Sequence, residues 1–515
     1  MTADTGNEPA AERGKRGLPA LTTERAADPE PSRAKRVGLV LAPLLAAAVF
    51  LLLPDAVSTS GKLTAAIAAL MATLWATEAL PIPVTALLPL VLFPVFGIAE
   101  VKDAAAPYAN DVIFLFMGGF MLALAMQKWN LHKRVALAIV GAVGTDPVRL
   151  IGGFMLATGF ITMWVANTAT TIMMLPIAIS VITLVTQLRN GRTDTNFATA
   201  LMLGVAYAAS IGSVATLIGT PPNALMVGYL KETFDIDVGF GQWMLVGFPL
   251  AAIFLVIAWV VLTRFVYPPE VTSLDGAQDI IKGELRDMGP MTPTERRVLG
   301  VFVAAAASWV FIPLLADSPL VSVLPWLDRI TDAGIAMAVA VALFLIPAPG
   351  TQGGKLLDWE TAVRLPWGIL LLFGGGLTLS SQFTATGLSE WIGTRVGALE
   401  GVPVWLLLLV VVALVLLLTE LTSNTATTAT FLPVLGGVAL GMDLDVMTLV
   451  VPATLAASLA FMLPVATPPN AVVFGSGQVT IGQMIKAGAW LNTVAVFVVL
   501  FTMYAIAGWA FGIAF

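Results

Sequence analysis

The chain has 515 residues, of which 58% are hydrophobic and 11% are charged, and its formal net charge is −6. Soluble domains carry about a quarter charged residues, so this composition excludes an ordinary soluble protein and predicts a polytopic membrane protein. The apolar runs are long and do not alternate, which favours an all-α fold over a β-barrel. The absence of cysteine excludes thiolate metal sites, and we expect the single histidine, His132, to be a solvated residue at a helix flank.

Residues 1–36 form a polar tail without an apolar core, which we predict to be disordered and not a signal peptide. Arg33, Lys35 and Arg36 directly precede the first apolar run, which places the N-terminus in the cytoplasm by the positive-inside rule. The apolar segments that follow lie at 37–54, 62–81, 83–99, 108–127, 135–144, 150–187, 198–230, 242–267, 296–315, 331–348, 365–388, 403–440, 447–480 and 484–515.

Two of these segments, 150–187 and 403–440, are too long for one membrane crossing and too short for two. Each carries a polar motif near its middle, Ala-Asn-Thr at 166–168 and Ser-Asn-Thr at 423–425. A segment of this kind is typical of a re-entrant hairpin, which runs to mid-membrane, turns and leaves again. Irregular backbone at that depth is tolerated where protein or a water-filled cavity covers it.

Two other segments each contain a Thr-Pro-Pro-Asn motif near the centre, at 220–223 and 467–470. Proline removes a backbone donor and clashes with the preceding turn, so each helix is expected to break there. A broken helix exposes amide and carbonyl groups at mid-membrane. Helix N-termini favour anions, and unwound carbonyls favour cations.

The paired motifs recur in order at nearly constant spacing, which indicates an internal repeat. Asn167 and Asn424 are 257 residues apart (424 − 167), and the Pro-Pro pairs are 247 residues apart (468 − 221). The polar stretch 268–295 separates the two copies and is expected to be a solvated linker. Duplicated, helix-breaking polar elements in apolar sequence are typical of secondary transporters, whose substrate site lies at the repeat interface.

The four motifs offer hydroxyls, amides and free backbone groups, but no Lys, Arg or His. Such a neutral site can hold a small anion through hydroxyls and helix N-termini, and two facing hairpins suit a ligand with an anionic group at each end. The same oxygen atoms suit an alkali cation. A cation beside each tip would supply the positive field that the side chains lack.

Two carboxylates lie within apolar sequence, where ionisable residues are functional candidates. For Glu78, close to Pro81 and Pro83, the sequence favours a role at a helix end. Glu420 lies three residues before Ser423, and it either hydrogen-bonds the hairpin tip or takes part in proton coupling. The chain has no phosphate-binding Gly-x-x-x-x-Gly-Lys-Ser/Thr motif, so ATP is not its energy source.

At these motifs the chain resembles the divalent anion/sodium symporter (DASS) family, which includes the INDY-type dicarboxylate and citrate transporters. The resemblance extends from residue 37 to the end, and it also includes Thr-Glu-Ala-Leu-Pro at 77–81 and Val-Thr-Ala-Leu at 84–87. It implies an inverted repeat with about eleven transmembrane helices, two re-entrant hairpins and two broken helices. It also implies a homodimer and an elevator-like movement of a rigid transport domain.

The resemblance also implies a division of the chain and a set of binding residues. The division is a cytoplasmic tail (1–36), first-repeat scaffold (37–149), first-repeat transport part (150–267), linker (268–295), second-repeat scaffold (296–402) and second-repeat transport part (403–515). The implied substrate contacts are Asn167, Thr168, Ser423, Asn424, Thr425, Thr467 and Pro468. The implied sodium sites are Thr162, Ala166, Asn167 and the carbonyl of Gly219 for the first, and Thr419, Thr422, Asn424 and the carbonyl of Ala466 for the second.

The chain departs from this family at Ala166, where serine is usual, and alanine removes one hydroxyl from the first cation site. The sequence thus predicts a transporter of the cytoplasmic membrane, not an enzyme, which imports C4-type dicarboxylates (succinate, malate, fumarate) with sodium ions and binds no nucleic acid. A sodium-independent dicarboxylate exchanger, to which Ala166 points, and a transporter of sulfate or another inorganic anion stay open. A membrane-embedded enzyme using Glu78 or Glu420 would lack a metal-ligand cluster and a nucleophile–base pair.

Overall fold

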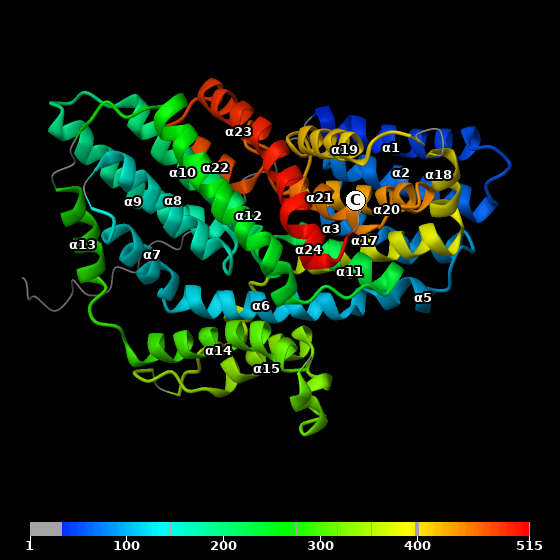
Figure 1. Cartoon of the computed structure of the whole chain (residues 1–515), viewed down its shortest axis with the longest axis horizontal. Coiled ribbons are helices and arrows are strands. Elements are labelled where there is room, and N and C mark those ends of the chain that lie inside the picture. The colour runs from blue at the N-terminus through cyan, green and yellow to red at the C-terminus, as the bar shows by residue number, and fades with distance from the viewer. Residues whose placement is uncertain are drawn as a thin grey trace, which may run out of the picture.

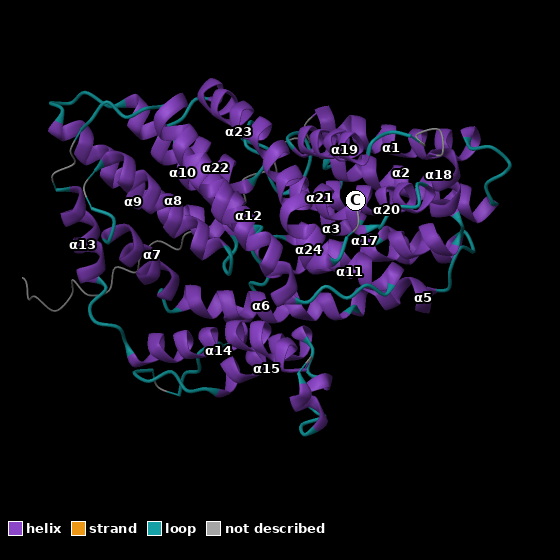
Figure 2. Cartoon of the chain, in the orientation of Figure 1, coloured by secondary structure: helices purple, strands orange, loops and turns teal. Residues whose placement is uncertain are grey.

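The computed structural model describes residues 33–144, 146–272, 276–316, 318–351, 353–396 and 401–513. Within these residues the elements are all helices, without a strand (Figure 2). In this described part of the chain, eight helices are long and apolar enough to cross a membrane, and five shorter apolar helical stretches accompany them. The predicted all-α membrane fold is confirmed, whereas the number of crossings stays a prediction. The predicted disordered tail lies outside the described residues except for 33–36, which begin the first helix.

The helices of the first half are α1 (Arg33–Leu52), α2 (Thr59–Thr77), α3 (Ile82–Thr85), α4 (Leu88–Val95), α5 (Val101–Ala105), α6 (Asp111–Lys128), α7 (Leu131–Gly141), α8 (Pro147–Thr162), α9 (Asn167–Leu188), α10 (Thr195–Ser213), α11 (Pro221–Phe234) and α12 (Phe240–Val260). Those of the second half are α13 (Ala277–Asp287), α14 (Pro293–Ala316), α15 (Asp332–Leu345), α16 (Trp359–Ala362), α17 (Trp367–Ala385), α18 (Leu388–Val396), α19 (Val404–Thr419), α20 (Asn424–Gly441), α21 (Met447–Ala457), α22 (Pro468–Gly475), α23 (Ile481–Thr502) and α24 (Gly508–Phe511). Short 3₁₀ turns η1 (Ala106–Ala109), η2 (Leu217–Gly219), η4 (Pro319–Ser322) and η5 (Leu327–Arg329), and π-helical turns η3 (Val261–Val266) and η7 (Met503–Ala507), complete the order.

Both segments with an Asn-Thr motif form a helix, a short turn and a second helix. The first helices, α8 and α19, end 257 residues apart (419 − 162), and the second helices, α9 and α20, begin 257 residues apart (424 − 167). The repeat seen in the sequence therefore holds for the helix boundaries. In Figure 1 the hairpin α8–α9 lies in the left half of the molecule and the hairpin α19–α20 in the right half.

Both broken helices are interrupted directly before their Pro-Pro pairs, as the sequence predicts. α10 ends at Ser213 and α11 begins at Pro221, while α21 ends at Ala457 and α22 begins at Pro468. The prolines occupy the first positions of α11 and α22, where the missing backbone N–H would have no intrahelical partner anyway. The residues between these helices, 214–220 in the first copy and 458–467 in the second, are called the first and second breaks below.

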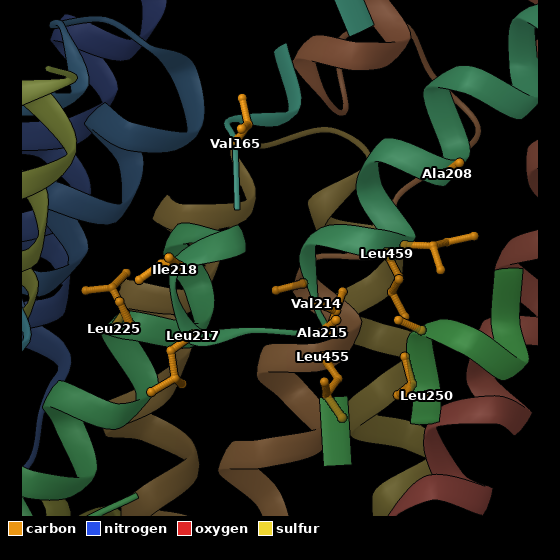
Figure 3. Packing of buried hydrophobic residues seen from close by; sticks show 14 of the residues in the cluster. Val165, Ala208, Val214, Ala215, Leu217, Ile218, Leu225, Leu250, Leu455 and Leu459 are labelled. Atoms are coloured by element: carbon orange, nitrogen blue, oxygen red, sulfur yellow. The ribbon is translucent and has the colours of Figure 1, made fainter. Parts of the chain in front are cut away.

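Among the membrane-length helices of the described residues, α10 is the most buried. About 89% of it is buried, whereas only 11% of α1 and 17% of α14 are buried. Side chains around both breaks, among them Val214, Leu217, Leu455 and Leu459, belong to one continuous hydrophobic core (Figure 3). The exposed sides of α1 and α14 are apolar, as lipid-facing helices require.

The two copies of the repeat contact each other crosswise. The hairpin helix α9 packs against α22 of the other copy as well as α10 of its own, and α20 packs against α11 as well as α21. On the opposite side of the molecule α14 and α15 lie together along α6 (Figure 1). Each hairpin is thereby placed beside the broken helices of both copies.

The predicted linker 268–295 is not a simple solvated loop. It contains α13, and its last residues are anchored to α7 by Arg134. The guanidinium of Arg134 donates to Glu295 from Nε (2.9 Å) and to the carbonyl oxygens of Gly289 (2.9 Å) and Met288 (3.2 Å). Glu295 is only 4% exposed, so this carboxylate depends on Arg134 for its charge partner. The expectation for His132 was also wrong, because this side chain is buried and its Nδ1 lies 3.1 Å from the carbonyl oxygen of Met126.

We expect Arg134→Ala to lower the free energy of unfolding by about 3 kcal/mol, because a buried carboxylate loses its cation. Thermal unfolding of the purified protein in detergent measures this as a lower Tm. Arg149→Ala, at the exposed start of α8, is the matched control and should leave Tm unchanged. Equal Tm values for both variants would contradict the anchoring role.

Candidate functional site

The second hairpin tip is held by hydrogen bonds among the residues predicted to bind the second cation. Thr419 Oγ1 lies 2.7 Å from Asn424 Oδ1 and 2.9 Å from the carbonyl oxygen of Ala457. Thr422 Oγ1 donates to the carbonyl oxygen of Leu418 and pairs with the hydroxyl of Thr427 at 2.6 Å. The structure therefore brings Thr419 and Asn424 together and places them against the end of α21. Oxygen atoms of this kind suit a sodium ion.

The second break is closed by the asparagine of its Pro-Pro-Asn motif. Asn470 Nδ2 donates to the carbonyl oxygen of Leu463 (3.1 Å) and lies 3.5 Å from that of Ala460. The hydroxyl of Thr467 accepts from the backbone N–H of Asn470, so Thr467 is the N-cap of α22. Ala466, whose carbonyl was predicted to face the cation, lies buried within this break.

The first break is closed in the same way. Asn223 Nδ2 donates to the carbonyl oxygens of Val214 (3.3 Å) and Thr216 (2.9 Å), and Trp243 Nε1 of α12 also donates to that of Val214 (3.0 Å). Gly219 lies here in η2, where a Cβ would collide with the carbonyl oxygen of Ser213. The sequence offered Asn223 and Asn470 as motif residues but not as site residues. Their spacing of 247 residues (470 − 223) was the signal for this shared role.

The first hairpin tip has fewer internal partners than the second. Thr162 Oγ1 bonds within its own helix, to the carbonyl oxygen of Gly159 at 3.1 Å. Asn167 Oδ1 and Thr170 Oγ1 are buried and have no hydrogen-bond partner among the described residues. Two unsatisfied buried oxygens beside the predicted first cation site are consistent with cation ligands, because a buried polar group normally has a partner.

Both hairpins present a helix N-terminus without a side-chain cap. Ala166 is the N-cap of α9 and Ser423 is the N-cap of α20, and neither side chain accepts a hydrogen bond from the first turn. The first backbone N–H groups of a helix have no intrahelical acceptor, so they remain available to an anion. Asn167, Thr168 and the residues at 424–425 are partly exposed around these two ends.

The two carboxylates that the sequence places within apolar segments, Glu78 and Glu420, have different surroundings. Glu78 is exposed and ends α2 in a left-handed conformation (φ 47°), which confirms a helix-end role. Glu420 is 4% exposed and accepts four backbone or side-chain donors, from Phe461, Met462, Leu463 and Asn492. The hydrogen-bonding alternative for Glu420 is thus realised, although with the second break and not with the tip itself.

A cavity of about 690 Å³ lies beside the first break. It is bounded by α6, α11, α12, α14 and α15, and Leu217 of the break lines it. Its charged lining consists of four aspartates: Asp111, Asp237, Asp328 and Asp332. A wall of this charge attracts cations and repels anions.

The chain matches the family model described as the sodium:sulfate symporter transmembrane region over residues 33–512. Among curated proteins, it is 41% identical to the sodium-dependent dicarboxylate transporter SdcS of Staphylococcus saprophyticus over 474 residues, which cover 91% of this chain and 90% of the relative. It is 39% identical to SdcS of Staphylococcus aureus (strain USA300) over 479 residues, which cover 92% and 91%.

Solved structures share the fold at low sequence identity. The MtrF protein of Neisseria gonorrhoeae superposes with a TM-score of 0.57 at 13% identity, over 95% of this chain and 96% of that one. The YdaH transporter of Alcanivorax borkumensis superposes with a TM-score of 0.54 at 16% identity, over 94% and 99%. At this identity the likeness concerns the fold alone.

We expect Gly219→Ala to destabilise the first break, because the new Cβ would meet backbone that cannot move aside. The free energy of unfolding should fall by about 1–3 kcal/mol, the usual penalty for overpacking. Thermal unfolding tests this, with Gly300→Ala in α14 as control, since nothing lies within 4 Å of its Cβ position. A Gly219→Ala protein as stable as the control would contradict the close approach.

Proposed function

The chain belongs to the sodium:sulfate symporter family, the divalent anion/sodium symporters to which its motifs pointed, and we propose that it imports C4-type dicarboxylates together with sodium ions. The observation that carries this proposal is the pair of hairpin tips, each an uncapped helix N-terminus beside oxygen-rich side chains. The relatives named as sodium-dependent dicarboxylate transporters, 39–41% identical over nearly the whole chain, favour an organic dianion over sulfate. As a transporter, the protein is not an enzyme.

The substrate is held without a basic side chain. The N–H groups at the starts of α9 and α20 each receive one carboxylate, assisted by the side chains at the two tips and by the start of α22. The residues proposed for these contacts are Asn167, Thr168, Ser423, Asn424, Thr425, Thr467 and Pro468. Two separate N-termini match a ligand with two anionic ends better than they match a compact inorganic anion.

Sodium supplies the positive charge that the side chains lack. In the second site Thr419 and Asn424, already in contact, receive the ion together with Thr422 and the carbonyl of Ala466. In the first site the ion is received by Thr162, Asn167 and the carbonyls of Ala166 and Gly219. Because the dianion is bound beside these two ions, its binding is expected to require sodium.

The elevator movement, the homodimer and the division into scaffold and transport domain belong to this proposal as well. The crosswise packing of α9 on α22 and of α20 on α11 supports a single moving unit built from 150–267 and 403–515. Helices α6, α14 and α15 then belong to the scaffold. The bacterial relatives support a cytoplasmic membrane, and the basic residues before α1 support a cytoplasmic N-terminus.

A sodium-independent dicarboxylate exchanger is the second candidate, because Ala166 removes one hydroxyl from the first cation site. Uptake of radiolabelled succinate into proteoliposomes separates the two. We expect accumulation in empty vesicles that requires an inward sodium gradient and falls on addition of unlabelled malate. Uptake that needs internal dicarboxylate and ignores sodium would establish the exchanger, and competition by sulfate but not by malate would contradict the proposed substrate.

We expect Asn167→Ala and Asn424→Ala to lower sodium-dependent succinate uptake at least about 100-fold, because each removes a contact shared by substrate and cation. Gln187→Ala, which removes an exposed amide at the far end of α9, serves as the control. Size-exclusion profiles and Tm show whether the variants are folded. Normal uptake by either asparagine variant would refute the site assignment.

Ala166→Ser should restore the hydroxyl and strengthen the first cation site. The sodium concentration for half-maximal uptake is expected to fall by about threefold to tenfold, the worth of one net hydrogen bond or ligand contact. Thr183→Ser, on the exposed face of α9, is the control. An unchanged sodium dependence in Ala166→Ser would mean that position 166 does not face the ion.

A further inference from the structure

We propose that Glu420 and Asn492 lock the second hairpin to the second break, whereas the first hairpin has no such lock and is ordered by sodium instead. Both residues are positioning residues, since neither is placed among the sodium or substrate ligands. The proposal rests on the proposed function only for the identity of the ordering ion. The lock itself follows from contacts within the protein.

Glu420 connects the two halves of the second cation site. It is the residue directly after Thr419, at the end of α19, and its carboxylate reaches three successive backbone N–H groups of the second break. Oε1 accepts from Phe461 (2.7 Å) and Met462 (2.9 Å), and Oε2 accepts from Leu463 (3.0 Å). Charge-assisted hydrogen bonds of this kind are about twice as strong as neutral ones.

Helix α23 contacts both the second break and Glu420. At Gly488 the helix approaches the break so closely that a Cβ would collide with the carbonyl oxygen of Phe461. One turn later Asn492 Nδ2 donates to Glu420 Oε1 at 2.7 Å, and both side chains are buried. The carboxylate thus receives three backbone N–H groups and one side-chain amide, which together fix its position between the end of α19, the second break and α23.

The first copy lacks both members of the lock. At the repeat spacing of 257 residues, Glu420 corresponds to Met163 (420 − 163). Here the end of α8 and the first break are joined, among the described residues, by a hydrogen bond from Thr216 Oγ1 to the carbonyl oxygen of Met163 at 2.5 Å. Helix α12 repeats the close approach at Gly247, where a Cβ would meet the carbonyl oxygen of Val214. The residue one turn after this glycine is Ala251, which has no amide to offer.

The two asparagines at the hairpin tips, Asn424 and Asn167, differ in their hydrogen-bond partners, as expected if only the second hairpin is locked. Asn424 Oδ1 has a protein partner, because the hydroxyl of Thr419 shares its one proton between this oxygen and the carbonyl oxygen of Ala457 at the end of α21. Asn167 Oδ1 is buried without a protein partner among the described residues. The second tip is therefore built by the protein alone, whereas the first tip is completed by a ligand. It follows that sodium should rigidify the first tip and leave the second nearly unchanged.

Hydrogen–deuterium exchange of the full-length protein in nanodiscs tests this difference. Peptides covering residues 163–171 should exchange about tenfold more slowly at saturating sodium than in choline buffer. Peptides covering 420–428 and 459–466 should change by less than about twofold. Equal sodium-dependent protection of both tips would overturn the proposal.

Glu420→Gln tests the lock without reference to any ion. The amide cannot accept at both oxygen positions, so in choline buffer exchange in peptides 420–428 and 459–466 should rise about tenfold over the wild type, and sodium should now slow it. Asn492→Ala, which removes one donor, should give a smaller rise and covers the case that Glu420→Gln does not fold. Unchanged exchange in both variants would refute the lock.

Transport kinetics separate this positioning role from a merely structural one. Asn492→Ala should raise the sodium concentration for half-maximal uptake by roughly tenfold, while the maximal rate at saturating sodium stays within about twofold. A fall in the maximal rate with unchanged sodium dependence would overturn the role. If sodium alters exchange at neither tip while the two variants still loosen the second hairpin, the lock stands and sodium coupling fails.

Discussion

Every interruption of a helix inside a membrane leaves backbone N–H and C=O groups that no lipid can satisfy. Within the described residues, the interruptions that carry the repeated polar motifs are two hairpin turns and two breaks. The remaining architecture can be understood as the means of satisfying those groups. The asparagine of each Pro-Pro-Asn motif turns back to the carbonyls of its own break, and α12 and α23 each approach a break at a glycine. Groups left over at the hairpin tips are the ones that can bind ions and anions.

The features that the sequence predicted are local or repeated. A Pro-Pro pair breaks a helix wherever it occurs in one, so both breaks were expected at the residues where they lie. The length of 150–187 and 403–440 with a polar centre likewise predicted each hairpin, and the spacing of 257 residues tied the two together. Family resemblance implied the carbonyl of Gly219 as a cation ligand, and this role stays a prediction. The structure gives a separate reason for glycine at this position, which is the close approach to Ser213.

The features that the sequence did not predict depend on pairs of residues far apart in the chain. The sequence around Glu420 does not predict that its carboxylate oxygens accept from backbone N–H groups some 40 residues later, or that Asn492 also donates to it. His132 looked like a solvated residue because its neighbours are basic, yet the packing of α7 buries it. The charges of neighbouring residues describe only the local sequence, whereas the burial of a side chain depends on which helices pack together.

The two copies of the repeat have similar helix boundaries but differ in how far their breaks are exposed, and such a difference suits a transporter. The first break is buried throughout, whereas the second exposes Val465 by 76%. Alternating access requires that a substrate site near the midplane of the membrane is open to one side at a time. An inverted repeat can expose one break at a time if its halves exchange environments, which is the general logic of alternating access. The locked second hairpin and the ligand-dependent first hairpin provide such a difference between halves, because a tip that is completed only by sodium can report that the ion has bound.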